Sequence, residues 1–81
     1  MDADWPVPAE WELERLEPAL IQRRIGLLIR CYARRRSPTV ARLVVRYLDG
    51  LCAHPRWRCG ADERCDFRRL ARRWRLLAEL G

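Results

Sequence analysis

The sequence predicts an all-α fold: a small antiparallel three-helix bundle with an additional short acidic N-terminal helix. Three observations support this prediction. Apolar residues recur at intervals of three and four along three long segments, proline or capping residues mark the segment boundaries, and no strand-like alternation or internal repeat occurs. At 81 residues the chain forms one domain with a modest core. We expect an extended N-terminal segment at 1–8, followed by a single helical domain at 9–81.

The first expected helix is short and covers 9–17. Pro8 suits a first helical turn, and Pro18 is expected to end or kink this helix. Its charged residues are mainly acidic: Glu10, Glu12, Glu14 and Glu17 against Arg15.

The second expected helix covers 19–35. Arg24 falls inside its apolar arc, where an unpaired charge would be costly. Three arrangements remain open for this side chain: its head reaches solvent, it pairs with Glu14 or Glu17 of the first helix, or it contacts a partner chain. The apolar positions of this helix are Leu20, Ile21, Ile25, Leu28, Cys31 and Tyr32.

The third expected helix covers 38–54 and begins with almost no loop. Ser37 is a helix-capping residue and Pro38 suits the first helical position, so this helix must run antiparallel to the second. The residue before proline avoids helical geometry, and His54-Pro55 should therefore stop the helix. Its expected core face comprises Val40, Leu43, Val44, Tyr47, Leu48 and Leu51.

The fourth expected helix covers 62–79. Its apolar residues fall within about a third of the circumference at 3.6 residues per turn. They are Phe67, Leu70, Ala71, Trp74, Leu77 and Ala78, and a neighbouring strip carries Arg64, Arg68, Arg72 and Arg75.

Charge is divided unevenly along the chain, whose net charge is +6. Residues 1–20 carry six acidic residues against Arg15, whereas the rest carries sixteen arginines against five acids. Because every basic residue is arginine, as is typical of the GC-rich coding bias of some bacteria, arginine richness alone is weak evidence for nucleic-acid binding.

An up-down-up arrangement would collect charges at opposite ends of the bundle. The acidic end would contain Asp49, Asp62, Glu63 and Asp66. Some of the charges at the two ends complement the helix dipoles. Arg42 does not, because it places a positive charge at the start of a helix. A cluster of guanidinium groups can bind carboxylates or phosphates with paired hydrogen bonds. We therefore predict a partner-binding surface at the basic end, formed by Arg34, Arg35, Arg36, Arg42, Arg72, Arg73 and Arg75.

The stretch LCAHPRWRCGADERC at 51–65 contains the candidate metal ligands: Cys52, His54, Cys59 and Cys65. These residue types suit tetrahedral zinc, but the spacing lacks the paired knuckles of structural zinc sites. Reduced cysteines are the favoured interpretation. Zinc and a Cys59 to Cys65 disulfide stay open as alternatives, and no metal or cofactor is predicted.

The tryptophans indicate binding to another protein, because tryptophan and arginine concentrate at binding hot spots. Trp57, between two arginines, is expected to be exposed, whereas Trp11 and Trp74 suit a core. We therefore expect a non-enzymatic protein-interaction or regulatory module. Its partner would be an acidic protein surface or a second copy of the chain. A nucleic-acid-binding protein, with Trp57 and Tyr32 stacking on bases, is the alternative, and a zinc or redox module is a third.

Several classes are excluded or disfavoured by the sequence. The longest apolar run, IGLLI, is far shorter than the roughly 20 residues of a membrane-spanning helix. The acidic start lacks the features of a secretory signal, which predicts a cytoplasmic location. No glycine-rich phosphate loop and no recognisable orienting group for His54 is present, so enzymatic activity is not expected.

Overall fold

The computed structural model describes residues 8–80 and confirms the all-α fold. Residues 1–7 of the predicted extended segment lie outside the described part, and Pro8, its last residue, is buried. Gly81 also lies outside the described part. The helices agree with the predicted ranges to within two residues at every boundary. They are α1 (Glu10–Arg15), α2 (Pro18–Arg34), α3 (Pro38–Cys52) and α4 (Ala61–Leu80).

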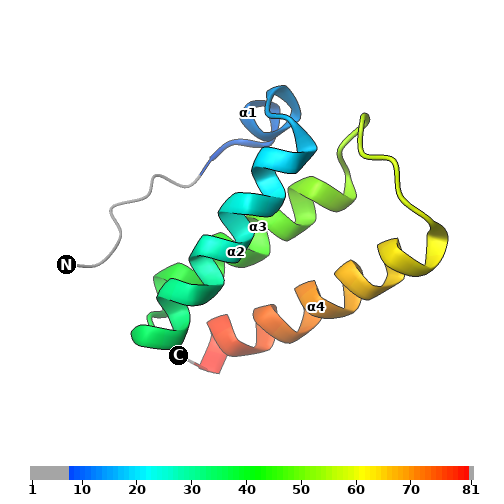
Figure 1. Cartoon of the computed structure of the whole chain (residues 1–81). Coiled ribbons are helices and arrows are strands. Elements are labelled where there is room, and N and C mark those ends of the chain that lie inside the picture. The colour runs from blue at the N-terminus through cyan, green and yellow to red at the C-terminus, as the bar shows by residue number, and fades with distance from the viewer. Residues whose placement is uncertain (1–7, 81) are drawn as a thin grey trace.

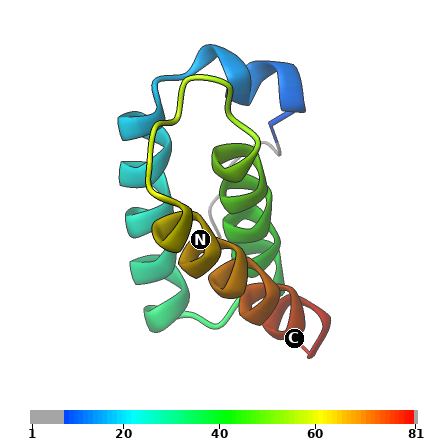
Figure 2. The same ribbon diagram turned by 90° about the vertical axis from the view of Figure 1, so that its right-hand side faces the viewer.

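The central helix of the bundle is α3. Both α2 and α4 pack against it and run antiparallel to it, and α1 packs across its C-terminal part (Figure 1). The end of α4 returns to the neighbourhood of the turn between α2 and α3 (Figure 1). Figure 2 shows that α4 passes obliquely across α3 instead of lying evenly between α2 and α3.

The helix starts follow from proline chemistry. Pro18 and Pro38 each occupy the first turn of a helix, where a missing N–H costs nothing. Pro18 therefore begins α2, and α1 already ends at Arg15. Ser37 stands at the cap position of α3 as predicted, although its side chain makes no capping hydrogen bond.

The core consists mainly of the predicted apolar faces, and all six residues of the expected α3 face are buried. The Tyr32 and Trp74 rings meet edge to face with centroids 4.9 Å apart, which joins α2 to α4. Cys31, predicted on the apolar arc of α2, is exposed. The largest fully buried side chains are Leu13, Ile21, Leu28, Leu43, Val44, Leu48 and Leu51.

Arg24 is half-buried and bonds to a neutral group. Its Nη1 donates to the Tyr47 hydroxyl at 3.3 Å, which satisfies one donor at the edge of the core. Glu17, one of its two expected partners, pairs instead with Arg56. Of the three arrangements left open for Arg24, pairing with Glu17 is therefore not the one that the structure shows.

The contact between α1 and α3 depends on Gly50. A Cβ atom at this position would lie 2.5 Å from Leu13 Cδ1 and 3.3 Å from Leu13 Cβ. Leu13 is only 1% exposed and has little room to move. At Gly26, in α2, a Cβ would meet nothing within 4 Å.

Alanine at these two glycines should therefore have opposite effects. Gly26→Ala should stabilise the protein by about 0.5–1 kcal/mol, because alanine is the better helix former. Gly50→Ala gains the same term but forces Leu13 aside, which costs about 1–3 kcal/mol. Urea denaturation should thus rank Gly26→Ala above the parent and Gly50→Ala below it. Equal stability of the two variants would show that α1 does not pack closely on α3.

Candidate functional site

His54 in the cysteine-bearing stretch has a structural role. Its side chain is buried, and its Nε2 lies 2.7 Å from the carbonyl oxygen of Leu16. Its Nδ1 accepts a hydrogen bond of 3.0 Å from the backbone N–H of Arg56. Because a carbonyl only accepts and an amide N–H only donates, the proton is on Nε2. Both ring nitrogens are therefore engaged, and neither is available to a metal or a substrate.

Arg56 strengthens the same junction. Its Nη1 lies 3.2 Å from Glu17 Oε1, and its Nη2 lies 3.4 Å from the carbonyl oxygen of Leu16. Together, His54 and Arg56 tie the loop after α3 to the corner between α1 and α2. The histidine that could suggest a metal or catalytic site thus helps to hold this corner in place.

All four cysteines are free thiols, so the alternative of a Cys59 to Cys65 disulfide is absent from the structure. Cys65 is exposed, whereas Cys52 and Cys59 are half-buried. Burial raises the pKa of the Cys52 thiol, and the nearby Arg68 guanidinium offsets only part of the rise. Within residues 8–80, no three His, Cys, Asp or Glu side chains are grouped closely enough to hold a metal ion.

These contacts predict that zinc does not stabilise the protein. Coordination by His54 would break its bond to Leu16 or Arg56, and the buried protonated thiol of Cys52 is a poor ligand. Elemental analysis of the reduced protein should find no stoichiometric zinc, and added zinc should leave the Tm unchanged. The opposite conclusion would follow from one zinc per chain that disappears in Cys52→Ser or Cys59→Ser.

The position of Trp57 differs from the sequence prediction. Its side chain is only 7% exposed, and its ring meets Phe67 edge to face at 5.2 Å. Arg64 lies 5.5 Å from the ring centroid and donates to the Trp57 carbonyl at 3.3 Å. The expectation of an exposed Trp57 is therefore wrong, because the loop folds back on the first turns of α4. A core position was the alternative for Trp11 and Trp74, and the structure buries Trp74 but leaves Trp11 61% exposed.

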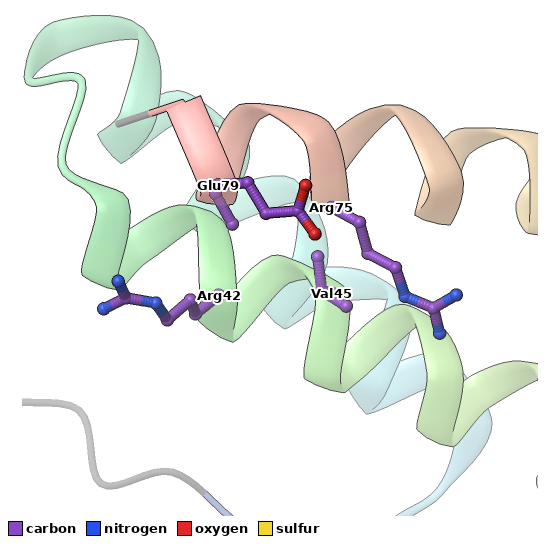
Figure 3. Close-up of a pocket in the computed structure, with 5 residues that line it drawn as sticks. Arg42, Val45, Arg75 and Glu79 are labelled. Atoms are coloured by element: carbon purple, nitrogen blue, oxygen red, sulfur yellow. The ribbon is translucent and has the colours of Figure 1, made fainter.

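The most distinctive surface feature is a groove between α3 and α4, on the side away from α2. It contains two hollows that share Arg75 and that we call together the arginine groove. The first, of about 340 Å³, is lined by Arg42, Val45, Arg75, Ala78 and Glu79 (Figure 3). The second, of about 320 Å³, is lined by Asp49, Cys52, Ala53, Arg68, Ala71, Arg72 and Arg75.

The charges in this groove are unbalanced, with four arginines against two carboxylates. Arg75 Nη2 lies 2.7 Å from Asp49 Oδ2. Among the described residues, no carboxylate lies within ion-pair distance of the other three arginines: Arg42, Arg68 and Arg72. In Figure 3 the Glu79 carboxylate lies over Val45, while the Arg42 and Arg75 guanidiniums point toward opposite ends of the hollow.

The structure brings together some of the predicted partner-binding residues and separates others. Arg42, Arg72 and Arg75 line the groove. Arg73 is exposed outside both hollows, as are Arg34, Arg35 and Arg36 around the end of α2. Arg68 also lines the groove but was not among the predicted partner-binding residues. Its spacing to Arg72 and Arg75, which places all three on one strip of a helix, could have identified it.

The predicted separation of the bundle into an acidic end and a basic end is wrong for Asp49 and Arg75. Asp49 was assigned to the acidic end and Arg75 to the basic end, yet their side chains form an ion pair. The physical reason is the length of α4. After the loop that follows α3, α4 begins beyond the end of α3 and then runs back alongside it. The C-terminal half of α4, not its start, therefore lies beside Asp49.

Comparison with known proteins shows no family that matches the chain, and no curated protein or solved structure matches it either. Over the described part of the chain, no helix combines the length and the apolar character needed to cross a membrane.

Proposed function

We propose that the protein is a small, non-enzymatic interaction module that binds an acidic surface of another protein through the arginine groove. The observation that carries this proposal is the group of three arginines, Arg42, Arg68 and Arg72, that line a groove without an acidic partner in the described chain. Arg34, Arg35, Arg36 and Arg73 would extend the basic surface beyond the groove.

The chemistry of the groove favours an anionic partner. Guanidinium groups bind carboxylates through two parallel hydrogen bonds, and such pairs combine energy with geometric specificity. Exposed arginines at the rim mainly raise the association rate and favour one orientation of the partner. A net charge of +6 opposes the pairing of two copies through this groove, which makes a different, acidic chain the favoured partner.

Nucleic-acid binding is the second candidate, but the structure supports it less well. The proposed stacking residues are engaged elsewhere, because Trp57 is buried and Tyr32 packs on Trp74. The carboxylates of Asp49 and Glu79 in the groove would repel phosphates and carboxylates alike, so they do not distinguish the two candidates. A zinc or redox module has less support still, since both nitrogens of His54 are engaged. We also propose a cytoplasmic location, because thiols stay reduced there.

Fluorescence anisotropy can test this proposal with labelled decaglutamate and random-sequence DNA as probes. At physiological salt, decaglutamate should bind more tightly than DNA, and Arg42→Glu/Arg72→Glu should weaken its binding by about tenfold or more. Arg23→Glu/Arg30→Glu makes the same change in net charge at exposed positions of α2 and is the matched control. It should retain most of the affinity.

The opposite ranking would reject the proposal. Tight DNA binding whose logarithmic salt dependence has a slope of about −0.9 per neutralised phosphate would identify a nucleic-acid-binding protein. Equal losses in the groove variant and the α2 variant would show that net charge, not the groove, determines binding.

A further inference from the structure

We infer that the occupant of the arginine groove is an amphipathic acidic helix of the partner protein, which lies along α3 and α4 as an additional helix of the bundle. This inference rests on the proposed function and makes it more specific, because it names the conformation and the residue pattern of the partner segment.

Small, largely buried side chains at a seven-residue spacing line the bottom of the groove, where α3 and α4 meet. Val45 and Cys52 lie seven residues apart on α3, and Ala71 and Ala78 lie seven residues apart on α4. Seven residues is the repeat at which one helix packs along another. None of the four side chains is large, and short side chains allow a helix axis to approach to about 8–10 Å.

The walls of the groove have a matching charge pattern. Arg68, Arg72 and Arg75 follow one another on α4 at intervals of four and three. Acidic residues at the same intervals on a facing helix would lie on one stripe. Those that face Arg68 and Arg72 would each meet a guanidinium without an acidic partner in the described chain, whereas Arg75 already pairs with Asp49. An extended peptide, whose side chains alternate with a period of two, would not keep this alignment.

The groove is also long enough for such a helix, and none of the residues that the structure describes fills it. From Arg68 to Glu79 the wall on α4 extends for about 17 Å, or roughly three turns. The short helix α1 packs against α3 at Gly50 instead. Its Leu13 and Glu14, with Arg46 and Gly50, line an adjoining hollow that shares Asp49 and Ala53 with the groove.

Two helical peptides of identical composition provide the test. The patterned peptide carries glutamates at intervals of four and three on one face, with alanine and leucine along one edge of that stripe. The permuted peptide distributes the same residues around the whole helix. Binding to the full chain is measured by fluorescence anisotropy, and the helix content of the peptides by circular dichroism.

The patterned peptide should bind about tenfold more tightly than the permuted one and should gain helix on binding. Arg68→Glu/Arg72→Glu should remove this preference, while the control Arg23→Glu/Arg30→Glu should retain it. Ala78→Trp, which fills the floor without changing charge, should also weaken binding of the patterned peptide.

Suppose that the two peptides bind the parent equally and that the Arg68→Glu/Arg72→Glu variant binds neither. This result would overturn the helical conformation of the occupant but would still support an acidic partner. Failure of both peptides and of decaglutamate to bind would reject the proposed function itself. The two failures are therefore distinguishable.

Discussion

Leu43→Asp should unfold the protein. Leu43 has no exposed surface and lies on the central helix, between the helices that pack on either side. The substitution removes a buried apolar side chain, which costs about 2–5 kcal/mol, and introduces a buried charge without a partner, which costs several kcal/mol more. A domain of 81 residues has about 4–12 kcal/mol of total stability. Circular dichroism should show loss of most helix at room temperature.

Leu76→Asp is the matched control for this variant. Leu76 is 60% exposed on α4, and Arg72 and Arg73 precede it by four and three residues. The same chemical change should alter stability there by only about 0.5 kcal/mol. If the Leu43 variant melts like the Leu76 variant, the assignment of α3 as the buried central helix is wrong.

His54→Phe should have the second largest effect. The substitution keeps a planar ring but leaves the backbone N–H of Arg56 without its acceptor, and it removes the short contact to the Leu16 carbonyl. A buried polar group without a partner costs about 1–3 kcal/mol, so the free energy of unfolding should fall by about 2–3 kcal/mol. Hydrogen exchange should accelerate first in residues 10–17 and 53–58, because these two segments lose their connection.

Arg58→Ala provides the control within the same loop. Arg58 is exposed, and this substitution should change stability by no more than about 0.5 kcal/mol. Unchanged exchange at the corner between α1 and α2 in the His54 variant would show that the histidine does not hold this corner. The metal and catalytic alternatives for His54 would then need to be considered again.

Sequence periodicity predicted the helices well, for a physical reason. Each helix buries one face, so that the spacing of Leu43, Val44, Leu48 and Leu51 directly reflects the direction of the core. Proline has a fixed geometry, which makes the start of α3 at Pro38 visible without any tertiary information. Pro18, expected to end or kink the first helix, instead begins α2.

Contacts between distant segments were less predictable. The buried position of Trp57 depends on how the loop meets Phe67, and the contact of Arg24 depends on the position of Tyr47 across the bundle. No local pattern contains either distance. The arginine strip of α4 was visible in the sequence, but its relation to α3 required the relative shift of the two helices, which the ion pair of Asp49 with Arg75 reveals.

An NMR titration of the isotope-labelled protein with decaglutamate tests most directly whether the arginine groove is the binding surface. We expect the largest changes in amide chemical shift at residues 42–53, which include most of α3 and the residue after it, and at residues 68–79 of α4. The exposed face of α2 should show little change. Changes centred on 34–36 with the groove amides unmoved, or no saturable change at all, would show that the groove is not the binding surface.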